Sequence, residues 1–243
     1  HFITSRYSKI IQTLGTASAF LLAIKGSRWD ELSRDSSITT EEKFQMFQSE
    51  RNRSFLSMMN VRYVISMFKF PSPWIRVFET SIVEEKIGDS VAAYIYENPD
   101  VLPRVYFADS AKIIEPDDEK AFDLLMEIKD FKKDILIECL ECQNYELGIM
   151  NQGDEIFVEE IRDGYLRLKT KTVSPRWLIR SESNLPTWEA RINGQLTKIY
   201  TANYLYQGIL VPAGENEIEF KYPGIFKQFS YSLKDLIKLK LKL

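Results

Sequence analysis

The sequence predicts a mainly β protein of the α+β class, in which an N-terminal helical segment precedes an antiparallel β-sandwich-like domain. Three observations predict it. Residues 1–60 carry apolar side chains at helical spacing. From residue 154 onward, short alternating runs follow one another at regular intervals with turn residues between them. Aromatic residues make up 13% of the chain, and strands are enriched in them.

These patterns divide the chain into three regions. We expect a helical segment at 1–60, an α/β region with strands and one short helix at 61–150, and the antiparallel sandwich-like region at 151–243. The helical segment contains a capping box from Thr39 to Glu42, in which each side chain can satisfy an unpaired amide of the first turn.

In the middle region, period-2 alternation predicts strands at 60–68, on both sides of a turn-rich break within 91–114, and at 134–139. Pro99 and Pro103 mark the break. The acidic start of "EPDDEKAFDLLMEI" predicts a short helix, because Asp117 or Asp118 can cap it and the helix dipole favours acidic residues in the first turn.

In the last region the predicted strands are EIFVEEI, GYLRLKTKTV, RWLIRSES, WEARI, LTKIYTA, YLYQGILV and NEIEFKY. Asn193-Gly194 predicts a type I′ hairpin turn between two of them, since both positions of that turn need a positive φ. The run at 204–211 is apolar on both faces, which favours a central strand covered on both sides.

Composition excludes several classes of function. The one histidine is His1, so catalytic triads and histidine metal sites are ruled out. The net charge of −3 provides no basic field for nucleic acid. We expect no metal, no cofactor and no nucleic-acid partner. Glu189 and Glu219 belong to solvated strand faces, and nothing singles out a carboxylate pair for glycoside hydrolysis.

The two cysteines form Cys139-Leu140-Glu141-Cys142 at the end of a predicted strand. A redox C-x-x-C normally opens a helix, and no helical pattern follows here. Structural cysteines, free or bridged, are therefore the favoured interpretation, with a thiol redox pair as the alternative. A disulfide would be compatible with an oxidising compartment.

No apolar stretch reaches the roughly 18–20 residues of a membrane span. Taken alone, this absence and the lack of a visible signal peptide indicate a cytoplasmic protein, but a fragment cut from between two membrane helices would look the same. The alternation of lysine and apolar residues at 236–243 favours an edge strand, with a segment attracted to anionic lipid as the alternative.

Three motifs carry a resemblance to a known family. "NVRYVI" at 60–65, "YENPDVLPRVYF" at 96–107 and "PTWEARINGQLTKIYTANYLYQGILVPAGENEIEFKY" at 186–222 occur in that order. Together they resemble the C-terminal extracytoplasmic region of the bacterial YfhO-like membrane proteins, over roughly residues 55–225. Thr187 departs from the pattern, which often has glycine before the tryptophan.

The resemblance implies a parent similar to the multi-pass glycosyltransferases that move a sugar from a polyprenyl-phosphate carrier to an envelope polymer. The catalytic acid of such enzymes lies in an early loop that these residues do not contain, so no catalytic residue is assigned. The chain is then expected at the extracytoplasmic face of the bacterial membrane, with its own membrane helices and an envelope glycan acceptor as partners.

The alternative function is a free-standing carbohydrate- or protein-binding sandwich. For glycan binding the candidate residues are Tyr204, Tyr206, Trp188 and Arg191. Aromatic faces stack on sugars, and polar groups reach the hydroxyls. Packing in the core is the competing interpretation of the three aromatic residues, and strand alternation favours it.

Overall fold

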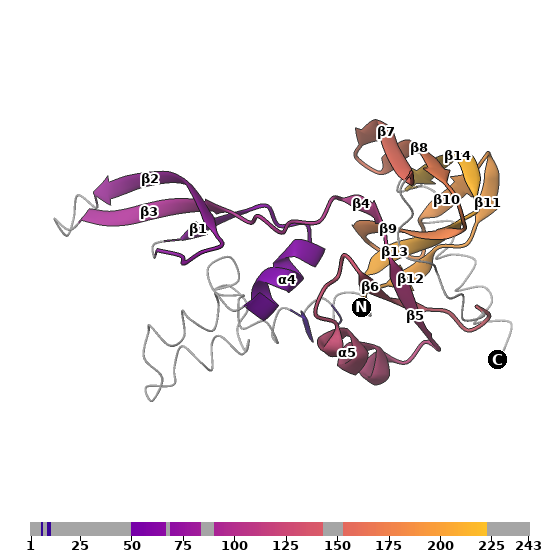
Figure 1. Cartoon of the computed structure of the whole chain (residues 1–243), viewed down its shortest axis with the longest axis horizontal. Helices are drawn as coiled ribbons and strands as arrows, with labels where there is room; N and C mark the ends of the chain where they lie inside the picture. Colours follow the sequence, from indigo (N-terminus) through magenta and orange to yellow (C-terminus); the bar gives the residue numbers. More distant parts are fainter. Residues whose placement is uncertain are drawn as a thin grey trace, which may run out of the picture. The chain divides into compact units, whose positions relative to one another are not determined.

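The computed structural model describes residues 50–66, 69–83, 90–142 and 153–222, besides Arg6, Lys9 and Ile10. These residues form a mainly β protein with the helices α4 and α5, as the sequence predicts (Figure 1). The capping box at 39–42 and the alternating segment at 236–243 lie outside the described residues.

The chain forms two compact units. One unit comprises His1–Arg104 with Met126–Asp134, and the other Val105–Leu125 with Ile135–Leu243. The second unit therefore takes elements from both the 61–150 and 151–243 regions, because strands from both regions pair in the same sheet.

The first unit contains α4 (Glu50–Met58) and a three-stranded antiparallel sheet in the order β1-β3-β2. The strands are β1 (Tyr63–Ser66), β2 (Ile75–Val83) and β3 (Ser90–Glu97). One face of the sheet covers a cluster of buried aromatic side chains: Phe70, Trp74, Tyr94 and Tyr96. Sequence alternation predicts β1 and β3, whereas β2 was not predicted.

The second unit is a sandwich of two sheets. The five-stranded sheet, in the order β11-β10-β14-β8-β7, is antiparallel throughout. Its strands are β7 (Glu155–Arg162), β8 (Tyr165–Thr172), β10 (Glu189–Ile192), β11 (Gln195–Thr197) and β14 (Gly214–Lys221).

The six-stranded sheet has the order β4-β9-β13-β12-β6-β5. Its strands are β4 (Val105–Phe107), β5 (Ser110–Ile114), β6 (Asp134–Glu138), β9 (Arg176–Ser183), β12 (Tyr200–Ala202) and β13 (Tyr206–Val211). The expected strand LTKIYTA is in fact two strands, because β11 belongs to one sheet and β12 to the other.

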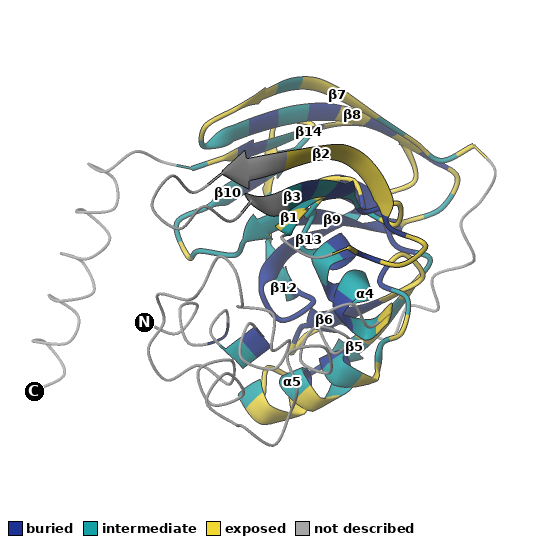
Figure 2. Cartoon of the chain, turned by 90° about the vertical axis from the view of Figure 1, so that its left-hand side faces the viewer, coloured by how far each residue is buried: buried dark blue, intermediate teal, exposed yellow. Residues whose placement is uncertain are grey.

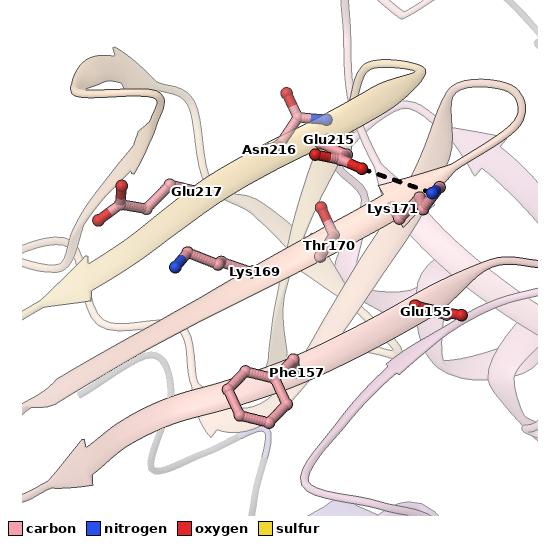
Figure 3. A pocket seen from close by; sticks show the side chains of 8 residues that line it. All are labelled: Glu155, Phe157, Lys169, Thr170, Lys171, Glu215, Asn216 and Glu217. Carbon is pink, nitrogen blue, oxygen red and sulfur yellow. Dashed lines mark ion pairs between the residues drawn. The ribbon is translucent and has the colours of Figure 1, made fainter.

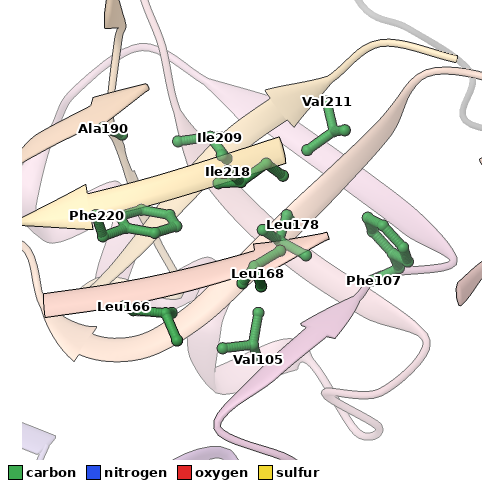
Figure 4. Close-up of a cluster of buried hydrophobic side chains, with 10 residues drawn as sticks. All are labelled: Val105, Phe107, Leu166, Leu168, Leu178, Ala190, Ile209, Val211, Ile218 and Phe220. Atoms are coloured by element: carbon green, nitrogen blue, oxygen red, sulfur yellow. The ribbon is translucent and has the colours of Figure 1, made fainter. Parts of the chain in front are cut away.

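Apolar side chains from both sheets meet in one core (Figure 4). The five-stranded sheet contributes Leu166, Leu168, Ala190, Ile218 and Phe220, and the six-stranded sheet Val105, Phe107, Leu178, Ile209 and Val211. Since side chains alternate between the faces of a strand, the charged residues between these positions point away from the core. Strands β9 and β13 are buried along most of their length, whereas β7 is largely exposed (Figure 2).

Local signals explain two further features. Asn193 and Gly194 have φ values of 51° and 78°, so the predicted turn joins β10 and β11 with a positive φ at both positions. Helix α5 (Asp118–Glu127) begins where predicted, and Asp117 caps it by accepting a 2.9 Å hydrogen bond from the amide of Lys120.

Candidate functional site

Tyr204 and Tyr206 are buried side chains of the second unit. Tyr204 is 0% exposed, and its hydroxyl donates to the carboxylate of Asp118, with both oxygens at 3.1 Å. Its ring lies 5.6 Å from that of Phe122 on α5. Tyr206 is 7% exposed at the start of β13. Both tyrosines thus pack in the interior, as strand alternation favours.

Trp188 lies half-buried at the edge of the sandwich core and already has a cationic partner. The guanidinium carbon of Arg180 lies 4.2 Å from the centre of the Trp188 ring and 5.1 Å from that of Phe220. Arg180 is itself buried, and its Nη1 donates to Oε1 of Gln207 at 3.2 Å. The indole ring is also 5.0 Å from the ring of Tyr222. These contacts cover much of its surface.

Arg191 lies on the opposite, outer face of the five-stranded sheet, where it pairs in register with Glu219. Its Nη1 donates to the carbonyl oxygen of Gly194 at 2.9 Å. The four candidate residues therefore do not form one site: Arg191 faces outward from a strand, whereas Trp188 packs against the core and the two tyrosines are buried elsewhere in the unit.

The outer face of the five-stranded sheet contains a groove that the sequence analysis did not identify. Its volume is about 350 Å³, and eight residues of β7, β8 and β14 line it: Glu155, Phe157, Lys169, Thr170, Lys171, Glu215, Asn216 and Glu217 (Figure 3). We call it the β7–β8–β14 groove. Strand pairing produces it, since Phe157 lies opposite Lys169 and Lys169 opposite Glu217.

Phe157 presents the groove's aromatic surface. Its side chain is 66% exposed, which is unusual for a phenylalanine in a strand. The segment EIFVEEI has apolar residues at adjacent positions, so alternation alone could not decide which of them faces outward. The register against β8 decides it, because Lys169 and Lys171 mark the outer face of that strand.

Both lysines of the groove make ion pairs with glutamates of the same sheet. Nζ of Lys169 lies 2.6 Å from Oε1 of Glu159, and Nζ of Lys171 lies 3.4 Å from Oε1 of Glu215. The bond with Glu159 raises the pKa of Lys169, and the same bond lowers the pKa of Glu159. Both groups are therefore charged over the whole neutral range.

Two further carboxylates line the groove, Glu155 and Glu217. Within the described residues Glu155 and Glu217 make no ion pair, although the charge of Glu217 helps to raise the pKa of Lys169. An exposed carboxylate without a cation accepts hydrogen bonds from solvent or from a ligand. The groove thus combines one apolar ring with hydrogen-bond acceptors and donors on a rigid sheet.

Cys139 and Cys142 form a disulfide immediately after β6, with their Cα atoms 5.5 Å apart. Of the alternatives left open by the sequence, the bridged form is the one observed. Between them, Glu141 accepts a hydrogen bond from Nζ of Lys198 and one of 3.5 Å from the hydroxyl of Tyr200. The bond from Lys198 is the main cause of a lowered pKa for Glu141.

In the part of the chain that the structure describes, no group of three or more histidine, cysteine, aspartate or glutamate side chains could hold a metal ion. None of the described helices has the length and apolar character needed to cross a bilayer. Comparisons with family models, with curated proteins and with solved structures gave no match to this chain.

Proposed function

We propose that this chain is a non-catalytic extracytoplasmic domain of a multi-pass membrane protein similar to the lipid-linked-sugar glycosyltransferases. In this proposal the domain holds an envelope glycan acceptor in the β7–β8–β14 groove. The observation that carries the proposal is the exposed ring of Phe157 on one sheet face, beside a lysine and two carboxylates that make no ion pair with any described residue.

Sugars offer two surfaces to a protein, and the groove matches both. Their C–H faces stack on flat apolar rings, which Phe157 provides. Their hydroxyl groups need hydrogen-bond acceptors and donors, which Glu155, Glu217 and Lys169 provide within the same groove. Because a sheet positions these groups rigidly, little ordering entropy is lost on binding.

The charges of the groove favour one class of glycan. Three carboxylates (Glu155, Glu215 and Glu217) and two ammonium groups (Lys169 and Lys171) line it, which leaves one net negative charge. A polymer dense in phosphate would be repelled, whereas neutral sugars or sugars with an amino group would not. We therefore propose a neutral or amino-sugar polymer as the acceptor.

Two features support the proposed location. The Cys139–Cys142 disulfide is compatible with an oxidising compartment outside the cytoplasm. The first unit also exposes large apolar side chains on β1 and β2: Tyr63 at 53%, Ile65 at 69% and Phe78 at 52%. Ile65 and Phe78 both pair with Ile95 of β3, so they form one continuous surface. Membrane helices of the parent are the partner that we propose for it.

The experiment is a titration of the isotope-labelled chain with envelope glycan fragments, one neutral, one with free amino groups and one rich in phosphate, followed by NMR. We expect millimolar binding of the first two, weakened about tenfold by Phe157→Ala. That factor corresponds to about 1.4 kcal/mol, which is what covering about 60 Å² of ring surface contributes.

Leu196→Ala is the matched control. Leu196 is also 66% exposed but lies on β11, at the other edge of the same sheet, and it does not line the groove. Its truncation should leave the affinity unchanged. Equal losses in both variants, or tightest binding of the phosphate-rich fragment, would contradict the proposal.

A further inference from the structure

We propose that the Cys139–Cys142 disulfide is an exchangeable redox site whose reaction partner is a protein dithiol. The site lies at the end of β6, in the six-stranded sheet, whereas the β7–β8–β14 groove lies on the five-stranded sheet. Disulfide exchange at this site is therefore independent of glycan binding in the groove, and either can be absent without the other.

The bridge is accessible from one side. Cys142 is half-buried, and the two residues before it are exposed, Leu140 with 71% of its surface. Cys139 is only 4% exposed. An attacking thiolate must approach the sulfur that it will bond, so Sγ of Cys142 is the atom attacked and Cys139 is the leaving group.

Strand β6 is held by contacts other than the bridge. Ile135, Leu136 and Ile137 are fully buried, and the amide of Cys139 donates a 2.8 Å hydrogen bond to the carbonyl oxygen of Ile114. The entropic stabilisation by a disulfide grows with the length of the loop that it closes, and this one joins residues only three apart in sequence. Opening it therefore costs the fold less than opening a long-range bridge would.

The exchange consists of two displacements. A thiolate of the partner attacks Sγ of Cys142, the Cys139–Cys142 bond breaks, and Sγ of Cys139 leaves as a thiolate that takes a proton from water. The partner's second thiolate then attacks the mixed disulfide and releases Cys142. In sum, the partner dithiol loses two electrons and two protons to become a disulfide, and this chain gains two thiols.

The state of the bridge is connected to the sandwich through Glu141. This residue lies between the two cysteines and accepts hydrogen bonds from Lys198 and from Tyr200 of β12. The ring of Tyr200 contacts Trp177 edge-on, with 5.4 Å between centroids. In the oxidised form the bridge holds Glu141 against these partners, and reduction removes that constraint.

The first test uses the intact chain. The oxidised protein is incubated at neutral pH with millimolar reduced glutathione, and free thiols are counted by alkylation and mass spectrometry while circular dichroism confirms that it stays folded. We expect at least half of the chains to gain two thiols, because an exchangeable bridge is reduced by glutathione, whereas a structural disulfide resists it. A bridge that stays closed in nearly all folded chains would overturn the proposal.

The second test identifies the sulfur that reacts. Cys139→Ser leaves Cys142 as the thiol, and Cys142→Ser is the matched control with the buried thiol. Each is mixed with a thioredoxin-fold protein whose first cysteine is activated as a disulfide with thionitrobenzoate. We expect the mixed disulfide to form at least about tenfold faster on Cys142. Equal rates, or faster reaction of Cys139, would contradict the assignment.

Discussion

Gly208 tests whether β13 is tightly packed on the face opposite to Ile209 and Val211, the two residues that this strand contributes to the sandwich core. A methyl group at this position would meet Cδ1 of Ile137 at 3.0 Å and Cβ of Ala202 at 3.2 Å. Because its backbone is not in the left-handed region, alanine can adopt the conformation and the cost is purely steric. Overpacking of this kind destabilises a core by about 1–3 kcal/mol. With a urea slope of about 2 kcal/mol/M, the unfolding midpoint of Gly208→Ala should fall by roughly 1 M.

A double-mutant cycle tests whether Cδ1 of Ile137 causes the destabilisation expected for Gly208→Ala. Ile137→Val removes Cδ1 and alone should cost about 0.5–1.5 kcal/mol. In the double variant the added methyl group fills the space left by Cδ1. The double variant should therefore lose about 1 kcal/mol less stability than the sum of the two single losses. The assay is urea unfolding followed by tryptophan fluorescence. Additive losses, or a Gly208→Ala variant as stable as the parent chain, would refute this packing.

Three further predictions concern polar contacts. Tyr204→Phe removes a hydrogen bond to a carboxylate and should lower the free energy of unfolding by about 1.5–3 kcal/mol in the same assay, whereas an unchanged value would contradict the contact with Asp118. Asp154→Asn removes one of the carboxylates that pair with the fully buried Arg176, at 3.2 Å, and leaves Asp109 at 3.8 Å, so it should cost about 1.5–3 kcal/mol; an unchanged free energy of unfolding would contradict the pairing. The hydrogen bond from Lys169 lowers the pKa of the Glu159 carboxyl. The stabilisation of the fold by this bond is therefore complete above the pKa of an unfolded glutamate, and it is lost as the pH falls through the pKa of Glu159 in the folded chain. Carboxyl NMR should find that folded pKa below the value in an unstructured peptide, and an equal value would refute the bond.

The sandwich could be predicted from sequence where the local signal and the tertiary structure agree. Asn193 and Gly194 specify their turn through a backbone conformation that few residues adopt. The strand at 204–211 is apolar on both faces, and from residue 206 to 211 it lies between β9 and β12. In β8 the alternation of leucine with arginine and lysine marks the inner and outer faces directly.

The remaining features depend on pairing between distant segments. Nothing local indicates that β4, β5 and β6 join strands from the end of the chain, because a strand carries no mark of its neighbours. Within LTKIYTA, no turn signal marks the change of sheet between Thr197 and Tyr200. Tyr204 has a positive φ of 72°, which alternation cannot anticipate.

The candidate site was the least predictable feature. Sequence reasoning selected aromatic residues in the motif with the clearest alternation, and these pack in or against the interior. Phe157 lies in a run with apolar residues on adjacent positions, and only its register with Lys169 assigns it to the outer face. A binding groove on a sheet face consists of side chains from several strands, so its residues come together only once the strand order is known.

The most direct measurement is to map where an envelope glycan binds. The isotope-labelled chain is titrated with a neutral or amino-sugar fragment, and amide shifts are assigned to residues. We predict saturable shifts concentrated at Phe157, Lys169 and Glu217, which line the β7–β8–β14 groove. The absence of shifts at millimolar ligand, or shifts confined to another surface, would contradict it.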